Sequence, residues 1–472
     1  MGGILDLKKT KIVCTIGPSV SNYEMIKKLA LSGMDVARLN FSHGTHSEHL
    51  KVINILKEVS EDTNKKIGIL LDTKGPDIRI GEFNNTIHIF TDQEYIFSVN
   101  KGKDIIPLQN DISRFLKPND KVLVDDGTLI FSVVRIEDKD IHLKALNEGN
   151  LRQKVSINIP ENEYCPSAVT ENELVDIKFG VKHEVDFIAL SFASTKEDII
   201  KAREIIKEDN GEQWIISKVE SNFGIKNIDD LIEYSEGIMV ARGDLGVEID
   251  LSKIPSVQRS IIEKCNVKGR PVIVATQMLN SMIENPRPTR AEVEDIASAI
   301  YSGADAVMLS GETAIGKYPL ESVEMMVKVA IETEKELKPR SEYGPSKRVA
   351  DVISSLVAKA VLLSDVKAIV TSTRSGYTAC MVSRHKLSVP TYGMTNNAAT
   401  ARKLSVVWGI NEVYLDKEKG GISKSVLHAA NYLKNEGLND NDFFVFTAGV
   451  SNSKKQRTNL LEIREIGEVL SS

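Results

Sequence analysis

Two carboxylates and two cations in this sequence stand at spacings that suit chemistry on a phosphate. Glu220 and Asp244 offer hard oxygen ligands without a neighbouring histidine, which suits Mg²⁺ or Mn²⁺ that keeps several waters and bridges to a phosphate. Lys218 precedes Glu220 by two residues and therefore faces the same side of a strand, and with Arg38 it can hold a phosphoryl group in transfer. These residues predict a phosphorylated or enolisable substrate. The alternative is that Lys218 and Arg242 merely neutralise the two carboxylates as structural ion pairs.

A second set of oxygen-bearing residues carries less charge. It comprises Asn40, Ser42, Asp72 and Thr73. This set has too little negative charge for a second tight divalent site, but a monovalent cation such as K⁺ would fit. Residues 243–246 turn into a helix whose free amides suit a substrate carboxylate, and Thr276 faces the same opening.

Buried parallel strands are the elements that must position these groups. Short β-branched runs alternate with helical patterns, which is typical of an α/β fold. The runs are 11–17, 36–42, 67–73, 187–192, 214–220, 237–244, 271–278 and 306–313. Eight strands predict a closed (β/α)₈ TIM barrel, whose polar residues belong at the carboxyl ends of the strands. One such residue is as readily an N-cap, but six strand ends carry polar clusters and predict one shared site.

The long gap between the third and fourth runs predicts an inserted domain. Its alternating patterns, with a turn at 125–128, favour a small all-β barrel or sandwich. After a polar stretch, a helix at 349–363 and strands at 368–373, 391–394, 413–415 and 443–447 indicate a C-terminal α/β domain. We therefore expect barrel segments at 1–73 and 170–343, the insert at 74–169 and the C-terminal domain at 344–472.

Composition excludes several classes of function. A net charge of −6 gives no basic field for a nucleic acid. The chain has no long apolar run or secretory leader, so no membrane partner is expected. Cysteines 14, 165, 265 and 380 lie far apart and are expected to be reduced thiols, which favours a cytoplasmic location.

Long motifs in order resemble the pyruvate kinase family over the whole chain. They are 10–18 (TKIVCTIGP), 37–44 (ARLNFSHG), 71–76 (LDTKGP), 239–246 (MVARGDLG), 275–279 (ATQML), 286–290 (PRPTR) and 310–314 (SGETA). The resemblance implies phosphoryl transfer from phosphoenolpyruvate to ADP, giving pyruvate and ATP, within glycolysis.

The resemblance also implies roles for single residues. Glu220 and Asp244 would bind Mg²⁺ or Mn²⁺, and the set of lower charge would bind K⁺. Lys218 would stabilise the transferring phosphoryl group, Arg38 would hold it, and Gly243, Asp244 and Thr276 would bind the substrate's carboxylate end. Thr276, through water, is the candidate for the path of the proton that reaches the enolate. Asn40, His43 and Arg79 would contact the nucleotide beneath the insert acting as a lid, although a residue such as His43, taken alone, is more often a capping or packing residue.

A candidate effector loop follows a strand in the C-terminal domain. Hydroxyls, amides and an arginine gather at Thr371, Ser372, Thr373, Arg374 and Ser375, as in a phosphate nest. This loop resembles the family's allosteric site for sugar phosphates or nucleotides, and a plain capped helix is the alternative. The family also implies a homotetramer.

Three departures from the family pattern stand out. Residues 154–158 lack the usual second lysine and glycine, so we do not carry over the nucleotide contact of Lys154. Residues 220–224 read Glu-Ser-Asn-Phe-Gly in place of Glu-Asn-x-Glu-Gly, which alters packing behind the metal site. Asp77 stands where K⁺-dependent members usually carry Glu, and its acidic sign favours K⁺ dependence with a changed affinity.

Two other functions fit a similar barrel. Metal-dependent lyases and aldolases also stabilise pyruvate enolates on a Glu/Asp pair, but they need no nucleotide lid. A sugar-phosphate sensor without catalysis would be expected to have lost Lys218, Glu220 or Asp244, and none is lost.

Overall fold

The computed structural model describes residues 8–76, 78–100, 102, 104–125, 127–160, 167–340, 343–344, 346, 348–414, 421–449 and 458–471. Eight parallel strands form a closed barrel in the order β1-β16-β15-β14-β13-β12-β3-β2. Their bounds are β1 Lys11–Thr15, β2 Val36–Asn40, β3 Gly68–Asp72, β12 Phe187–Leu190, β13 Trp214–Val219, β14 Gly237–Ala241, β15 Val272–Ala275 and β16 Ala306–Leu309. The predicted TIM barrel is confirmed.

Most barrel strands end a few residues earlier than the sequence patterns indicated. β2 ends at Asn40, so Ser42 lies in the following loop. β13 ends at Val219, and Arg242 already begins a helix directly after β14. Asp244 therefore lies in a helix and not on a strand, because the chain bends outwards once the ladder of parallel hydrogen bonds stops.

Amphipathic helices surround the barrel. They are α1 Tyr23–Ser32, α2 His46–Thr63, α3 Glu171–Lys182, α4 Lys196–Glu208, α5 Asn222–Lys226, α6 Ile228–Tyr234, α7 Arg242–Glu248, α8 Ile254–Lys268, α9 Arg290–Ser302, α10 Gly311–Ala314 and α11 Pro319–Lys335. Capping boxes at Thr45, Thr170, Thr195 and Thr289 start four of them close to the strand-end loops. Fully buried aliphatic residues fill the space between helices and strands and hold the barrel together.

The insert is all-β, as expected, with its own core around Phe97 and Phe131. Its strands are β4 Ile87–Ile89, β5 Glu94–Ser98, β6 Ile105–Pro107, β7 Lys121–Val124, β8 Leu129–Glu137, β9 Asp140–Ala145, β10 Gly149–Leu151 and β11 Ile157–Asn158. They form a six-stranded sheet and a two-stranded one. The predicted turn joins β7 to β8, with Asp125 and Gly127 in left-handed conformations.

A five-stranded sheet, in the order β19-β18-β17-β20-β21, forms the core of the C-terminal part. Its strands are β17 Val366–Ser372, β18 Thr391–Thr395, β19 Ile410–Tyr414, β20 Phe443–Ala448 and β21 Leu460–Glu465, and its helices are α12 Val349–Leu363, α13 Tyr377–Ser383, α14 Ala398–Lys403, α15 Ile422–Asn435 and α16 Ile466–Ser471. The helix at 349–363 is confirmed. The strand predicted at 413–415 instead begins at Ile410, and β21 was not predicted.

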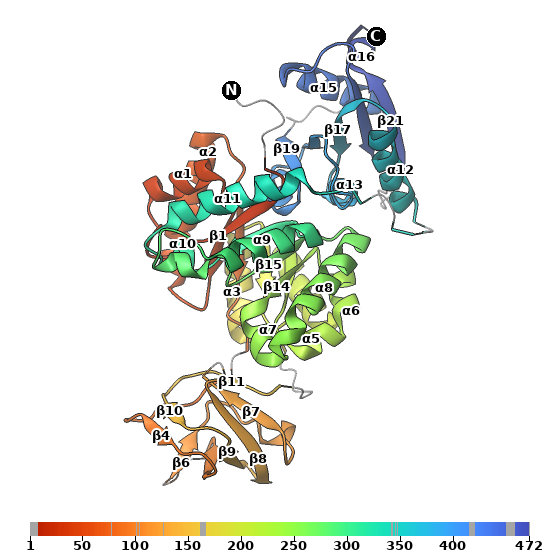
Figure 1. The fold of residues 1–472 in the computed structure, drawn as a ribbon. Helices are drawn as coiled ribbons and strands as arrows, with labels where there is room; N and C mark the ends of the chain where they lie inside the picture. Colours follow the sequence, from red (N-terminus) through yellow and green to blue (C-terminus); the bar gives the residue numbers. More distant parts are fainter. Residues whose placement is uncertain are drawn as a thin grey trace.

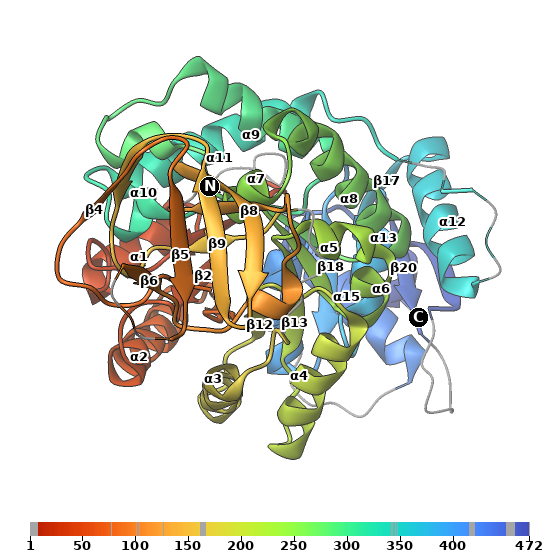
Figure 2. The same ribbon diagram turned by 90° about the horizontal axis from the view of Figure 1, so that it is seen from below.

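The insert and the C-terminal sheet lie at opposite ends of the barrel (Figures 1 and 2). The insert leaves the barrel after β3 and stands over the end where the strands finish. The C-terminal part packs at the other end, where buried Lys386 pairs with Asp305, 2.8 Å away and directly before β16. Among the described residues, no helix combines the length and apolar composition needed to cross a membrane. Cys14, Cys265 and Cys380 are buried and unpaired, as expected, and Cys165 lies outside the described residues.

Candidate active site

Four of the predicted residues meet at the carboxyl ends of β2, β3 and β13. Asp72 Oδ2 accepts a hydrogen bond from Arg38 Nε at 2.6 Å, and its Oδ1 lies 3.0 Å from Lys218 Nζ. Lys218 Nζ also lies 2.8 Å from Glu220 Oε1. The sequence placed Lys218 and Glu220 on one face, and the structure confirms this. Asp72 holds the two cations together, which the sequence patterns did not indicate.

All three N–H groups of the Lys218 ammonium have an acceptor. The acceptors are Asp72 and Glu220 at the distances above and the Ser191 hydroxyl at 2.7 Å. Burial disfavours the charge of Lys218, but the neighbouring carboxylates outweigh burial and raise its pKa above the ordinary value. Burial likewise opposes ionisation of Asp72, yet Lys218 and Arg38 hold the pKa of this carboxyl below its ordinary range. The centre of the site is therefore a charged, largely buried network.

Glu220 and Asp244 fit a divalent cation. Glu220 is 2% exposed, and its Oε2 accepts a hydrogen bond from the backbone N–H of Phe192 at 2.7 Å. Burial raises the pKa of Glu220 above its ordinary range. Attraction by Lys218 opposes this shift, and repulsion from Asp244 adds to it. A buried carboxylate held next to a second carboxylate is stabilised by a cation. Because no group of three His, Cys, Asp or Glu side chains within the described ranges is arranged to hold a metal ion, water and substrate would complete such a coordination shell.

Arg242 pairs with Asp295, a partner that the structural alternative considered above did not include. Its Nη1 contacts both carboxylate oxygens of Asp295 in α9, at 2.7 and 2.6 Å. Its Nη2 donates to the backbone carbonyl of Thr276. Lys218 forms an ion pair with Glu220, as that alternative required.

Thr276 and Gln277 both adopt left-handed backbone conformations, with φ of +73° and +55°. Such conformations are costly for residues with a side chain and cluster at functional sites. The Thr276 hydroxyl accepts a hydrogen bond from the Gly243 N–H at 2.9 Å. Thr276 and the start of α7 are thereby joined at the barrel mouth, as the sequence predicted.

The residues predicted to bind K⁺ lie on two paired strands and the loops that follow them. The register of β2 and β3 places Asn40 beside Asp72. Asn40 Oδ1 accepts from the backbone N–H of exposed Ser42 at 3.1 Å. The Thr73 hydroxyl accepts from the Ser191 N–H at 3.1 Å. These oxygens share one edge of the site, and Asp72 is already paired with two cations, so a monovalent ion suits this set better than a divalent one.

The residues predicted to contact the nucleotide are spread over the barrel and the insert. His43 is exposed, and its carbonyl accepts a hydrogen bond from His49 Nε2 at 2.9 Å. Arg79 lies in the insert, where its Nη1 donates to the Lys154 carbonyl at 2.8 Å. Lys154 pairs with Glu82 at 2.8 Å, and Asp77 lies outside the described residues.

The altered segment after Glu220 forms a local cap. The Ser221 hydroxyl accepts from the Gly224 N–H at 3.1 Å and starts the short helix α5. A serine therefore replaces the usual asparagine as an ordinary N-cap residue behind Glu220.

The C-terminal loop joins β17 to α13, as predicted. Arg374 and Ser375 are exposed, and Ser372 is half-buried. The Thr373 hydroxyl accepts from the Gly376 N–H at 3.0 Å. Thr371 is fully buried and donates its hydroxyl to the Tyr392 carbonyl at 3.1 Å, so its hydroxyl is already used inside the sheet.

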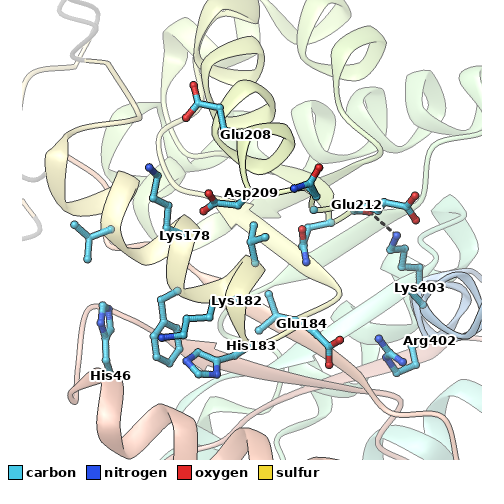
Figure 3. Close-up of a pocket in the computed structure, with 18 residues that line it drawn as sticks. His46, Lys178, Lys182, His183, Glu184, Glu208, Asp209, Glu212, Arg402 and Lys403 are labelled. Carbon is cyan, nitrogen blue, oxygen red and sulfur yellow. Dashed lines mark hydrogen bonds between the residues drawn. The ribbon is translucent and has the colours of Figure 1, made fainter.

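Two of the cavities formed by the described residues bear on the candidate site or are notably large. One of about 510 Å³ borders Gly243, Asp244, Gln277 and the Arg242–Asp295 pair, and so continues the candidate site. Another, of about 1010 Å³, is lined by α3, the end of α4 and α14 (Figure 3). Lysines and carboxylates mix on its walls, and none of the predicted site residues lines it.

Several contributors were missed from the sequence. Ser191 and Phe192 follow the fourth barrel strand, whose end was not among the six predicted to carry the site. The Thr15 hydroxyl accepts from Arg38 Nη1 at 2.9 Å. A hydroxyl at the end of a barrel strand was the available signal for Ser191 and Thr15, whereas nothing in the sequence links Asp295 to Arg242.

A closed parallel barrel with a lysine, an arginine and two carboxylates at its carboxyl end, beneath a β insert, defines a phosphotransferase of the TIM-barrel class. The family profile described as "Pyruvate kinase, barrel domain" matches residues 7–323, and "Pyruvate kinase, alpha/beta domain" matches residues 351–464. The chain belongs to the pyruvate kinase family. Its substrates are phosphoenolpyruvate and ADP, and its products are pyruvate and ATP, in a reaction of glycolysis.

Curated relatives and a solved structure are similar to this chain over nearly its full length. A pyruvate kinase of Sporosarcina psychrophila is 39% identical over 482 residues, 98% of this chain and 82% of the relative. One from Staphylococcus aureus (strain MRSA252) is 40% identical over 483 residues, 99% of this chain and 82% of the relative. The crystal structure of a pyruvate kinase from Cryptosporidium parvum superposes with a TM-score of 0.90 at 34% identity, covering 97% of this chain and 96% of that one.

Proposed function

We propose that Lys218, Arg38 and Thr276 carry out the pyruvate kinase reaction in this chain. The observation that carries the proposal is the Lys218 network, in which two cations and two carboxylates lie within hydrogen-bond distance in a buried mouth. Lys218 and Arg38 present positive charge from two strands towards the same point. Fixed charge in a dry site stabilises a transferring phosphoryl group more than water does.

The substrate's carboxylate end would lie at the start of α7. Gly243 and Asp244 form the first turn of that helix, and Thr276 is bonded to the Gly243 N–H. Thr276 would orient the water that delivers a proton to the enolate carbon after phosphoryl transfer. Lys218 and Arg38 would meanwhile keep the phosphoryl group aligned for attack by ADP.

Two kinds of cation complete the proposal. Glu220 and Asp244 would hold Mg²⁺ or Mn²⁺, which supplies charge for the enolate and phosphate oxygens when bound. Asn40, Ser42, Asp72 and Thr73 would hold K⁺. The family in general uses a divalent metal and K⁺, and the donor types of these residues support the assignment.

The nucleotide would bind between the barrel and the insert. Asn40 ends β2, His43 follows it, and Arg79 lies in the insert. The insert, standing over this end of the barrel, would act as a lid that excludes water (Figure 2).

Regulation and assembly are also proposed. A phosphorylated sugar or nucleotide would bind the loop of Ser372, Thr373, Arg374 and Ser375, with Thr371 supporting it from the sheet. We further propose a cytoplasmic homotetramer and a domain division at 1–73, 74–169, 170–343 and 344–472.

The test is pyruvate formation from phosphoenolpyruvate and ADP with Mg²⁺, with and without K⁺, and with sugar phosphates and AMP added in turn. Glu220→Gln should abolish turnover and weaken Mn²⁺ binding measured by electron paramagnetic resonance. Glu236→Gln is the matched control, because this carboxylate accepts from the Ile215 N–H at the opposite end of the barrel. Wild-type turnover in Glu220→Gln would refute the metal assignment. No response to K⁺ would refute the K⁺ site, and no response to any added effector would count against the loop.

A further inference from the structure

One buried carboxylate joins the two chain segments that connect the barrel to the insert. The chain leaves the barrel through Thr73 and Gly75 and returns at 167–170, before α3. Glu173 is 1% exposed, and its Oε1 accepts from the Gly75 N–H at 3.0 Å. Its Oε2 accepts from the Thr170 N–H at 3.2 Å and from the Thr170 hydroxyl. The two crossing segments are therefore held at a fixed separation.

The outgoing segment packs directly against Ser191 and Phe192. Gly75 has φ of +81°, and a Cβ added there would lie 2.8 Å from both the Ser191 Cβ and the Phe192 ring. Ser191 donates its N–H to the Thr73 hydroxyl at 3.1 Å and its own hydroxyl to the Thr73 carbonyl at 2.6 Å. No free space separates these residues, so a shift of the outgoing segment must move Ser191 or Phe192.

Ser191 and Phe192 contact the catalytic network on their other side. The Ser191 hydroxyl accepts from Lys218 Nζ at 2.7 Å, and the Phe192 N–H donates to Glu220 at 2.7 Å. Phe192 is itself in a left-handed conformation, with φ of +54°. The chain is therefore strained directly after the fourth barrel strand, at the residue that bonds Glu220.

We propose that Ser191 is a positioning residue that couples the segments holding the insert to the ammonium of Lys218. The inference rests on the proposed role of Lys218. Ser191 is the neutral acceptor among the three that Lys218 uses, since the other two are carboxylates. The contact with Ser191 is therefore the least costly to exchange when a phosphoryl oxygen takes up an N–H of Lys218. The insert's connection thus sets the geometry from which Lys218 engages the substrate.

The test compares Ser191→Ala with the control Ser217→Ala. Ser217 lies on the same strand as Lys218, and its fully buried hydroxyl is hydrogen-bonded to the Ser235 hydroxyl at 2.6 Å. Ser191→Ala should lower kcat about tenfold while changing KM for phosphoenolpyruvate less than about twofold. Exchange of the pyruvate methyl protons for deuterium, followed by NMR, should be unchanged because that step transfers no phosphoryl group. Ser217→Ala should keep the wild-type kcat, and Ser191→Cys should recover part of the loss.

A double mutant tests the coupling itself. Glu173→Gln should also lower kcat, and adding it to Ser191→Ala should cause little further loss because both act through one link. Additive losses, or wild-type kcat in Ser191→Ala, would overturn the inference. A fall in methyl-proton exchange equal to the fall in kcat would also overturn it, because the defect would then be general. If Lys218→Met keeps full turnover, the proposed function itself fails, whereas an inactive Lys218→Met beside a normal Ser191→Ala refutes only the coupling.

Discussion

Replacing Lys218 by methionine should separate its catalytic role from its structural one. The change keeps most of the length of the side chain but removes the ammonium from three acceptors at 2.7 to 3.0 Å. Two of these acceptors are carboxylates, Asp72 at 0% and Glu220 at 2% exposure. Breaking a buried ion pair by removing one partner costs about 3–5 kcal/mol. Because Arg38 still pairs with Asp72, we expect a loss near the lower end, about 3 kcal/mol.

The loss of stability should depend on pH. In the wild type, Lys218 and Arg38 keep the pKa of Asp72 low despite burial, which contributes stability above the pKa of the unfolded chain. In Lys218→Met this support weakens, and the pKa of Glu220, already raised by burial, rises further. A carboxyl group with a raised folded-state pKa binds protons more tightly in the folded state, so the free energy of unfolding falls as pH rises. The deficit should therefore be larger at about pH 8 than at about pH 5.

The assay combines urea unfolding at both pH values with steady-state turnover. Lys218→Met should lose turnover about a thousandfold or more. Lys386→Met is the matched control, since Lys386 is fully buried and paired with Asp305 at the other end of the barrel. It should lose stability without a comparable loss of turnover. The reasoning would be refuted by a Lys218→Met enzyme that is as active as this control. It would also be refuted if the stability lost relative to wild type were the same at both pH values.

Two further predictions concern groups outside the Lys218 network. Asp295→Asn should lower kcat about tenfold, because Arg242 would no longer be held firmly against the Thr276 carbonyl. Glu294→Gln, which changes the neighbouring carboxylate, is the neutral control. An unchanged kcat together with an unchanged solvent isotope effect would contradict this prediction. Burial lowers the pKa of His385 to about 4, so the protein should lose up to about 3 kcal/mol of stability as pH falls from about 7 to about 4. Urea unfolding of His385→Gln should show a smaller loss over that interval, and an identical pH dependence would count against the assignment.

The barrel could be predicted because its strands are short, apolar and repeated at βα-unit spacing. The polar residues at strand ends were sufficient to predict that Arg38, Lys218 and Glu220 lie together, whereas a site shared with Thr276 stays a prediction. The exact ends of the strands were wrong by a few residues, since periodicity does not show where the ladder of hydrogen bonds stops. Strand β21, which pairs antiparallel with β20 at the edge of the sheet, was missed because its charged residues interrupt the apolar pattern used to find the other strands.

Contacts between distant segments explain the remaining differences. In one interpretation, the sequence paired Arg242 with Asp244, two residues away, and it did not indicate the pair that Arg242 forms with Asp295 on another helix. Asp72 was predicted as a K⁺ ligand alone, yet it joins Arg38 to Lys218. Side-chain direction at a strand end depends on φ and ψ of one or two residues, and a single sequence does not encode those angles visibly.

The mouth of the barrel concentrates features that reduce stability. Phe192, Thr276 and Gln277 are left-handed without being glycine, and each such conformation costs of order 1 kcal/mol or more. Glu220 is buried beside another carboxylate, with a raised pKa. The buried core of the barrel contributes the stability that offsets these unfavourable conformations and charges. Since Phe192 holds Glu220 and Thr276 holds Gly243, the strained residues are the ones that orient the proposed chemistry. Relieving the strain, for example by Gln277→Gly, should therefore reduce activity and not improve it.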